Sequence, residues 1–201
     1  MSELIPFSRD AFSSGQVGSK LWLIQLLESL VPAHGRTGDQ SVWILGGWEG
    51  VLGFMLLARE GSPNALLLQS VRSFDLDEPA TARANVLCEN WVWREWRFRA
   101  FTVDCNELDY DADAWGPRPT IVINTSVEHF GQSNDWFAKI PPGTVVALQA
   151  SDFAHDGADH LIKDAESLAQ LYPLSTEWFR GSMGFEYSNW SFNRLMTIGV
   201  K

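Results

Sequence analysis

The sequence is poor in cysteine, with only Cys88 and Cys105 among 201 residues. Two thiols cannot build the disulfide framework of a small secreted protein, so we expect both to be reduced and the protein to be cytoplasmic. Long hydrophobic runs are also absent, because no stretch approaches the roughly 18 apolar residues of a membrane span. The opening residues, MSELIPFSRD, lack the basic and apolar regions of a secretory signal. We therefore expect neither secretion nor a membrane partner.

Basic residues are outnumbered, with 15 lysines and arginines against 25 acidic residues and a formal net charge of −10. Such a surface repels phosphate backbones, so a nucleic acid is not expected as substrate or partner. The densest basic stretch comprises Arg94, Arg97 and Arg99, which alternate with acidic and aromatic residues. This alternation favours a solvated strand edge over a nucleic-acid-binding patch.

What the chain does contain is a regular alternation of apolar strands and helices. The first helix is expected to start at Ser19 as its N-cap, because Leu21, Trp22 and later leucines recur at helical spacing. Strands are expected at 41–45, 65–75, 98–104, 119–124, 144–149 and 194–201, and further helices at 51–59, 79–88 and 164–171. No repeat or linker divides the chain, so we expect one domain.

Strands that alternate with helices predict an α/β fold with a mostly parallel sheet covered on both faces. Ligands of such sheets bind beyond the carboxyl ends of the strands. Polar residues collect at these ends here: a glycine turn after the first strand, then Asp75, Asp104 and the run Asn124-Thr125-Ser126. The sequence therefore predicts a binding site along this edge of the sheet.

The glycine turn, GGWEG at residues 46–50, narrows the class of ligand. It matches neither the G-x-G-x-x-G dinucleotide fingerprint nor a Walker A loop, which needs a Lys-Ser/Thr pair. The remaining candidate is a ligand with an adenosine but no phosphates. Asp75 could accept two hydrogen bonds from a ribose diol, and Asp104 one from an adenine amino group. The alternative is that such aspartates cap the next helix, as Asp77 before Pro79 is placed to do.

Across about residues 41–201 the sequence resembles the class I S-adenosylmethionine-dependent methyltransferases. In VWILGGWEG, Gly46 and Gly50 fall on the outer glycines of the family's first motif. Asp75 falls on its ribose-binding acid, and Asp104-Cys105 on the pair that flanks adenine. RPTIVINTSVEHF, IPPGTVVAL and NRLMTIGVK are similar to the family's fourth, fifth and seventh strands.

The resemblance implies a Rossmann-like fold at residues 41–201: one mostly parallel seven-stranded sheet with helices on both faces and an antiparallel last strand. Residues 1–40 would form an N-terminal helical extension or lid. The implied cofactor is S-adenosylmethionine, and the cofactor-binding candidates within this range are Gly46, Gly47, Trp48, Gly50, Asp75, Leu76, Asp104 and Cys105. Lys20, beside residues of the first helix that face the core, could pair with the cofactor carboxylate; an exposed helix lysine is the alternative.

Two positions depart from the family pattern. Ile44 stands where the family usually has an acid, and Trp48 replaces the middle glycine. The Trp48 indole could cover a ligand or lie near a sulfonium by cation–π attraction. It could equally pack on the N-terminal helix, so both interpretations stay open.

The resemblance implies methyl transfer to a small molecule. The stretch NTSVEHF, at 124–130, places several polar groups just past the fourth strand, where a base and a substrate-orienting amide would be useful. Candidate catalytic residues are Asn124, Ser126, Glu128, His129 and Ser188. Ordinary loop chemistry, which satisfies backbone groups, is the alternative for the Asn-Thr-Ser run.

Three further readings stay open. The outline is also similar to the azetidine-2-carboxylate synthases, which implies cyclisation of S-adenosylmethionine with release of methylthioadenosine, and aminocarboxypropyl transfer is related chemistry. A non-catalytic binding module on the same fold is the third. No metal is expected, because His155 and His160 in DFAHDGADH are five residues apart with a glycine between them. A loop that caps the next helix explains this stretch better, with His160 near the pocket.

Overall fold

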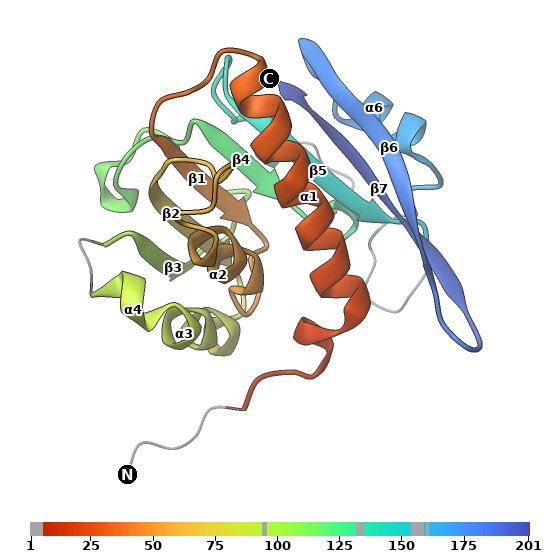
Figure 1. Ribbon diagram of the computed structural model, residues 1–201, viewed down its shortest axis with the longest axis horizontal. Coiled ribbons are helices and arrows are strands. Elements are labelled where there is room, and N and C mark those ends of the chain that lie inside the picture. Colours follow the sequence, from red (N-terminus) through yellow and green to blue (C-terminus); the bar gives the residue numbers. More distant parts are fainter. Residues whose placement is uncertain (1–5, 94–95, 132–134, 154–158, 160) are drawn as a thin grey trace.

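The computed structural model describes residues 6–93, 96–131, 135–153, 159 and 161–201. A single seven-stranded sheet runs through the molecule in the order β3-β2-β1-β4-β5-β7-β6 (Figure 1). Its strands are β1 (Gln40–Leu45), β2 (Leu68–Asp75), β3 (Phe98–Thr102), β4 (Ile121–Asn124), β5 (Val145–Ser151), β6 (Thr176–Glu186) and β7 (Ser191–Val200). Within these ranges no helix is long and apolar enough to cross a membrane.

The sheet is parallel except at β7. Strands β1 to β5 pair in parallel with their neighbours, whereas β7 runs antiparallel to both β5 and β6. The fold predicted from the sequence, a mostly parallel seven-stranded sheet with an antiparallel last strand, is confirmed. The chain order reverses between β1 and β4, so their carboxyl ends flank the point where such sheets bind ligands.

Helices cover both faces of the sheet. The helical elements are η1 (Asp10–Phe12), α1 (Ser14–Ala33), α2 (Val51–Ala58), α3 (Glu78–Leu87), α4 (Glu89–Val92), η2 (Asp113–Trp115), η3 (Val127–His129), α5 (Asp135–Ala138) and α6 (Ala165–Leu171). Alternate residues of β1 divide between two apolar clusters, because successive side chains of a strand point to opposite faces. Val42 and Ile44 pack with α1 and α2, whereas Trp43 and Leu45 pack with α5 and α6.

The start of α1 differs from the sequence expectation. Ser13, not Ser19, is the N-cap: its backbone is extended and its side chain accepts a hydrogen bond from the N–H of Gln16. Ser19 is buried inside the helix. Gly15 and Gly18 obscured this first turn in the sequence, since glycine disfavours helix interiors. Both are needed there for packing, because a Cβ on Gly15 would lie 2.7 Å from Tyr187 Oη and one on Gly18 2.9 Å from Phe185 Cε1.

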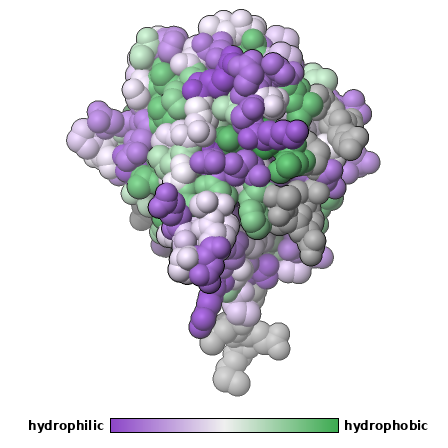
Figure 2. Space-filling view, turned by 90° about the vertical axis from the view of Figure 1, so that its right-hand side faces the viewer, coloured by the Kyte–Doolittle hydropathy of each residue, from purple (hydrophilic) through white to green (hydrophobic). Residues whose placement is uncertain are grey.

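Among the strands that the structure describes, β6 is the one that the pattern of the sequence did not locate. Its residues alternate between exposed and half-buried, and two glycines, Gly181 and Gly184, interrupt the apolar positions. Figure 1 shows β6 and β7 as a long hairpin at one side of the molecule. Figure 2 looks onto that side, where hydrophilic and hydrophobic residues are interleaved. The tip of the hairpin lies beside the first turns of α1, where Tyr187 Oη is 3.2 Å from Ser14 Oγ.

The other edge of the sheet is β3, which ends two residues before the expected Asp104. At its start Arg97 forms an ion pair with Glu60 at 2.6 Å and donates to the carbonyl of Leu68. Arg99 lies over the ring of Trp96, 5.5 Å from the ring centre. Arg97 and Arg99 therefore make contacts within the protein at the edge of the sheet. Arg94 lies outside the described residues.

Candidate active site

A cavity of about 920 Å³ lies at the carboxyl ends of the parallel strands, between α1 and the tip of the β6–β7 hairpin. Most of the residues singled out from the sequence line it: Lys20, Gly46, Gly47, Trp48, Asp75, Leu76, Asp104, Cys105, Ser126, Glu128 and His129. Gly50, Asn124 and Ser188 are not on its wall. Residues from both ends of the chain complete it, among them Asp10, Gln16, Trp190 and Arg194.

The glycine turn and the end of β2 are joined through the Asp75 carboxylate. Its Oδ2 accepts a 2.7 Å hydrogen bond from the backbone N–H of Trp48, and its Oδ1 accepts one of 3.0 Å from the N–H of Asp77. Each carboxylate oxygen has a second lone pair, and the side chain is only half-buried at the cavity. Asp75 can therefore accept two hydroxyl hydrogen bonds from a ligand without giving up its backbone contacts.

The first two positions of the turn, Gly46 and Gly47, have no room for a side chain. Gly46 has a φ of +63°, and a Cβ there would lie 2.9 Å from the Phe130 ring. A Cβ on Gly47 would lie 1.9 Å from Ser73 Oγ. Trp48 adopts the unusual φ of +46°, lines the cavity and belongs to neither apolar cluster. Trp48 is therefore part of the wall beside the space available to a ligand.

Gly50 acts in the packing of helices rather than at the cavity wall. It precedes α2 with a φ of +78°, and a Cβ there would lie 2.7 Å from Ala84 Cβ of α3. Its positive φ and this close approach both require glycine. Gly50 therefore sets the distance between α2 and α3, and through it the direction in which α2 leaves the turn.

Glu49 is a residue of the turn that the sequence reasoning missed. It is 1% exposed, its carboxylate accepts from the N–H of Ser8 at 3.2 and 3.0 Å, and it pairs with Arg83 of α3 at 2.7 Å. The segment before α1 is thereby tied across the turn. Neighbouring Asp10, Ala11 and Ser13 then lie over the cavity. An acid within a glycine turn was the available signal.

At the end of β3, Asp104 and Cys105 face the cavity next to Asp75. Asp104 Oδ1 accepts hydrogen bonds from both nitrogens of Asn106, at 2.8 Å from the backbone and 3.0 Å from the side chain. Cys105 is 5% exposed, and burial raises the pKa of its thiol to about 12. The thiol is thus neutral at physiological pH and is suited to packing rather than to nucleophilic attack.

Asn124 shapes the loop after β4 from behind the cavity wall. Its side chain is fully buried, and its Oδ1 accepts a 2.9 Å hydrogen bond from the N–H of Ser126. The carbonyl of this amide, a candidate for orienting a substrate, is therefore engaged by the backbone. Ser126 and the exposed His129 lie on the wall instead, at the two ends of the η3 segment.

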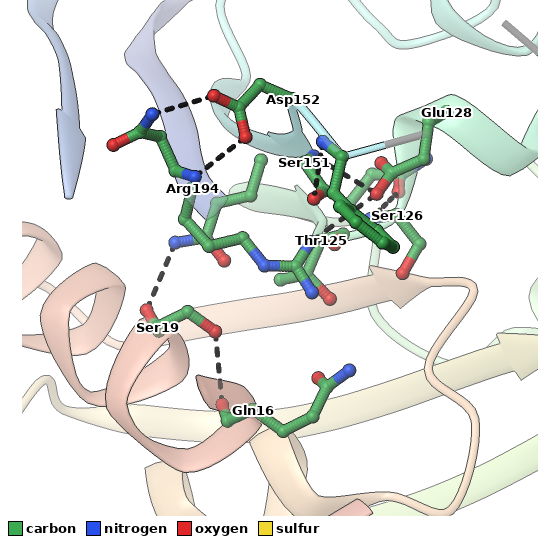
Figure 3. A network of polar contacts seen from close by, with 12 residues as sticks. Gln16, Ser19, Thr125, Ser126, Glu128, Ser151, Asp152 and Arg194 are labelled. Carbon is green, nitrogen blue, oxygen red and sulfur yellow. Dashed lines mark hydrogen bonds and ion pairs between the residues drawn. The ribbon is translucent and has the colours of Figure 1, made fainter. Parts of the chain in front are cut away.

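A buried charged network lies beyond the ends of β4 and β5. Glu128 is 2% exposed, and its Oε1 accepts from the N–H of Ser151 at 3.1 Å and from Arg194 Nη1 at 3.4 Å. Arg194 Nη1 also donates to the carbonyl of Thr125 at 3.3 Å. In Figure 3 the Arg194 side chain reaches from β7 towards the loop after β4, with Gln16 of α1 facing it. The sequence analysis did not single out Arg194, which is the residue of β7 that pairs with Ser151 of β5.

Lys20 comes from α1 and is 8% exposed, so the alternative of an exposed helix lysine is wrong. Its Nζ donates to Gln16 Oε1 at 2.5 Å. Burial, and secondarily the positive charge of Arg194, lowers the pKa of Lys20 to about 7, while Asp10 opposes this shift. The amine is thus poised to gain a proton when an anion enters the cavity.

Ser188, a candidate from the sequence, lies at the rim of the cavity. Ser188 is exposed in the turn between β6 and β7, beyond the wall formed by its neighbours Tyr187 and Trp190. His155 and His160 lie outside the described residues. Asp152 and Asp159 hold loops together by accepting from the N–H groups of Asn193 and Gly131. The described residues bring no three potential metal ligands together.

No protein-family model and no curated protein matches this chain in sequence. Solved structures match it in fold. The N-methyltransferase NodS from Bradyrhizobium japonicum, in complex with S-adenosylhomocysteine, has a TM-score of 0.61 at 12% identity over 92% of this chain and 88% of that chain. Magnesium protoporphyrin IX methyltransferase from Synechocystis, with bound S-adenosylmethionine, has a TM-score of 0.59 at 14% identity over 96% and 85%.

The YcgJ protein from Bacillus subtilis has a TM-score of 0.61 at 11% identity, over 90% of this chain and 98% of that chain. Identities this low show a common fold and leave the chemistry to be argued from the site. The strand order and the single antiparallel strand described above agree with this likeness. The protein therefore has the Rossmann-like fold of the class I S-adenosylmethionine-dependent methyltransferases.

Proposed function

We propose that the protein is an S-adenosylmethionine-dependent methyltransferase that acts on a small molecule. The observation that carries this proposal is the Asp75 carboxylate, which is half-buried on the cavity wall and held by two backbone N–H groups beside the glycine turn. A carboxylate so placed is a ribose-binding group. NodS and the Synechocystis enzyme, which share the fold, were crystallised with S-adenosylhomocysteine or S-adenosylmethionine.

The rest of the cavity wall fits the same ligand. Asp104 and Cys105 flank the space beyond Asp75, where an adenine ring would lie, and Leu76 offers an apolar surface there. Gly46 and Gly47 admit an amino-acid chain close to the backbone. Lys20, at the far end, can pair with its carboxylate. S-adenosylmethionine, when bound, supplies an electrophilic methyl group on a sulfonium.

The residues past β4 are placed to act on the acceptor. Methyl transfer needs alignment of the acceptor atom and, for a protonated nucleophile, a base. His129 is exposed at the cavity and can take a proton, and Ser126 can orient a polar group. Glu128 accepts from Ser151 and Arg194, so it fixes the ends of β5 and β7 relative to the η3 segment.

Closure of the cavity supports a small acceptor. The segment before α1 is held by Glu49, and the β6–β7 hairpin contacts the first turn of α1 through Ser14 Oγ and Tyr187 Oη at 3.2 Å. The segment before α1 and the first turn of α1 thus act as the lid of this proposal. A cavity of about 920 Å³ that is partly covered in this way holds the cofactor and a small molecule more readily than a polymer.

The test is an incubation of purified protein with S-adenosylmethionine, with and without candidate acceptors, followed by mass spectrometry. The proposal predicts S-adenosylhomocysteine only when an acceptor is present. Methylthioadenosine from the cofactor alone would instead establish cyclisation or aminocarboxypropyl transfer. Calorimetry that detects no affinity for S-adenosylmethionine or S-adenosylhomocysteine would favour a non-catalytic module and refute the proposal.

A further inference from the structure

The guanidinium of Arg194 is buried with few of its donors engaged. The residue is 8% exposed and lines the cavity, yet its hydrogen bonds to the described residues come from Nη1 and are long, 3.3 Å to Thr125 O and 3.4 Å to Glu128 Oε1. Its Nε has no partner among the residues that the structure describes. A buried guanidinium normally forms short, paired bonds to an anion. Arg194 therefore has N–H donors left for a ligand.

The charges around Arg194 leave room for an anion. Lys20 is a second buried basic group. It lies close enough to Arg194 for the positive charge of the guanidinium to lower the pKa of Lys20, and its Nζ donates to Gln16 Oε1. The acidic groups that act on Arg194 are Glu128, which also serves Ser151, and Asp10 at the rim. One buried carboxylate thus faces two buried basic groups. The cofactor carboxylate can pair with Lys20, which leaves Arg194 for the carboxylate of a second ligand.

An aromatic wall adjoins this charged end. Tyr187, Trp190 and Phe192 stack from the hairpin, with ring centres 4.6 Å apart for the first pair and 5.3 Å for the second, nearly parallel in both. Phe153 meets Trp190 at 5.2 Å. Trp190 and Phe153 remain 47% and 42% exposed although both line the cavity. Flat apolar rings exposed inside a cavity indicate a flat apolar ligand.

We propose that this end of the cavity binds the methyl acceptor, a small molecule with a carboxylate attached to an aromatic or similarly flat group. Arg194 binds the carboxylate, and Trp190 and Phe153 contact the ring. The inference rests on the proposed function, because it assigns the other end of the same cavity to the cofactor. Arg194 and the ring wall lie beyond β5, on the opposite side of β4 from Asp75, as an acceptor site requires.

The test is a binding assay with matched probes: benzoate, phenylacetate and indole-3-acetate, each beside its neutral amide. Ligand-observed NMR would measure each probe against the wild-type protein, alone and saturated with S-adenosylhomocysteine. We expect at least one acid to bind and its amide to bind at least tenfold more weakly. Arg194→Met should remove the preference for the acid, and Trp190→Ala should weaken acid and amide alike.

Two controls keep the result interpretable. Arg180→Met removes an arginine of β6 that is outside the cavity wall and should leave probe binding unchanged. Arg194→Lys keeps the charge without the fork of donors and should retain part of the preference. Thermal unfolding would show whether Arg194→Met folds. If it does not, Arg194→Lys and the comparison of acid with amide on the wild-type protein decide the question.

Three results would overturn the proposal. They are amides that bind as well as acids, a preference for acids that survives Arg194→Met, and a panel in which no acid binds. A fourth outcome overturns it in favour of the cofactor: if Arg194→Met weakens S-adenosylhomocysteine but not methylthioadenosine, the carboxylate bound there is the cofactor's own. Failure of the proposed function looks different, because S-adenosylhomocysteine would then not bind the wild type at all while probes alone still could.

Discussion

The backbone N–H of Trp48 donates a 2.7 Å hydrogen bond to Oδ2 of Asp75, across 27 residues of sequence. This bond fixes the glycine turn to the end of β2 and holds Trp48 at its positive φ. The same carboxylate faces the cavity, so the group proposed to bind a ribose also shapes the turn that the ligand lies against.

Replacement of Asp75 by alanine should weaken S-adenosylhomocysteine binding by at least tenfold. Hydrogen bonds to an ionised group contribute roughly 1.5–3 kcal/mol each, and two are lost. Calorimetry on folded variants measures the change, with Asp113→Ala, an exposed acid outside the cavity, as the matched control. Unchanged affinity in folded Asp75→Ala protein would refute the ribose assignment.

The two glycines Gly50 and Gly35 offer a matched pair for packing. Both have a φ near +78°, but a Cβ on Gly50 would meet Ala84, whereas one on Gly35 would meet nothing within 4 Å. Gly35→Ala should therefore lower the free energy of unfolding by about 1–2 kcal/mol, the strain of the left-handed conformation. Gly50→Ala should lower it further, by about 1–3 kcal/mol of overpacking. Equal losses in urea unfolding would exclude the α2–α3 contact.

Lys20 should make stability depend on pH. Its pKa in the folded protein, about 7, is below the 10.5 of the unfolded chain, so the unfolded state binds more protons between these values and stability rises with pH. The penalty is fully present below pH 7 and is gone above pH 10.5, and amounts to at most about 5 kcal/mol.

Lys20→Met should consequently raise the melting temperature at pH 6 relative to wild type, and the advantage should shrink between pH 7 and pH 10. Lys163→Met, an exposed control, should show no such trend. Thermal unfolding at a series of pH values measures both. A constant difference between Lys20→Met and wild type over this range would contradict the buried state of the amine.

Glu49 should control the segment that closes the cavity. Glu49→Gln weakens the acceptor for the Ser8 N–H and leaves the Arg83 guanidinium without its anion. Loss of one partner of a buried ion pair is destabilising by about 3–5 kcal/mol. We expect faster hydrogen exchange at residues 6–13, measured by mass spectrometry, and partial recovery of stability in the double variant Glu49→Gln/Arg83→Met. Exchange at wild-type rates in Glu49→Gln would show that Glu49 does not anchor the segment.

The sequence indicated β1 to β5 because each is an apolar run bounded by turn residues, and it located their polar carboxyl ends. The cavity residues Asp75, Asp104 and Ser126 followed from this local pattern. Strand β6 was not located, because its glycines and exposed positions resemble a loop until the pairing with β7 is known. The N-cap Ser13 could not be recognised from the sequence because two glycines follow it in the first turns of α1. Those glycines are needed for close contact with the β6–β7 hairpin.

The residues that sequence reasoning missed act over long separations. Glu49 binds Ser8 across 41 residues, and Arg194 reaches Glu128 across 66. No local periodicity records such a contact, since it depends on which strands become neighbours. Asn124 was placed on the right loop, but its side chain turned to the N–H of Ser126, a choice fixed by the backbone of that loop.

The contact between Ser14 and Tyr187, which closes the cavity, spans 173 residues. Contacts of such separation form late, because the entropy of closing a long loop must be overcome before they stabilise the chain. We therefore expect the sheet strands β1 to β5 to assemble first and the cavity to be completed last, when the hairpin packs on Gly15 and Gly18. During synthesis on the ribosome, the ability to bind a ligand would then mark a chain whose hairpin has already emerged.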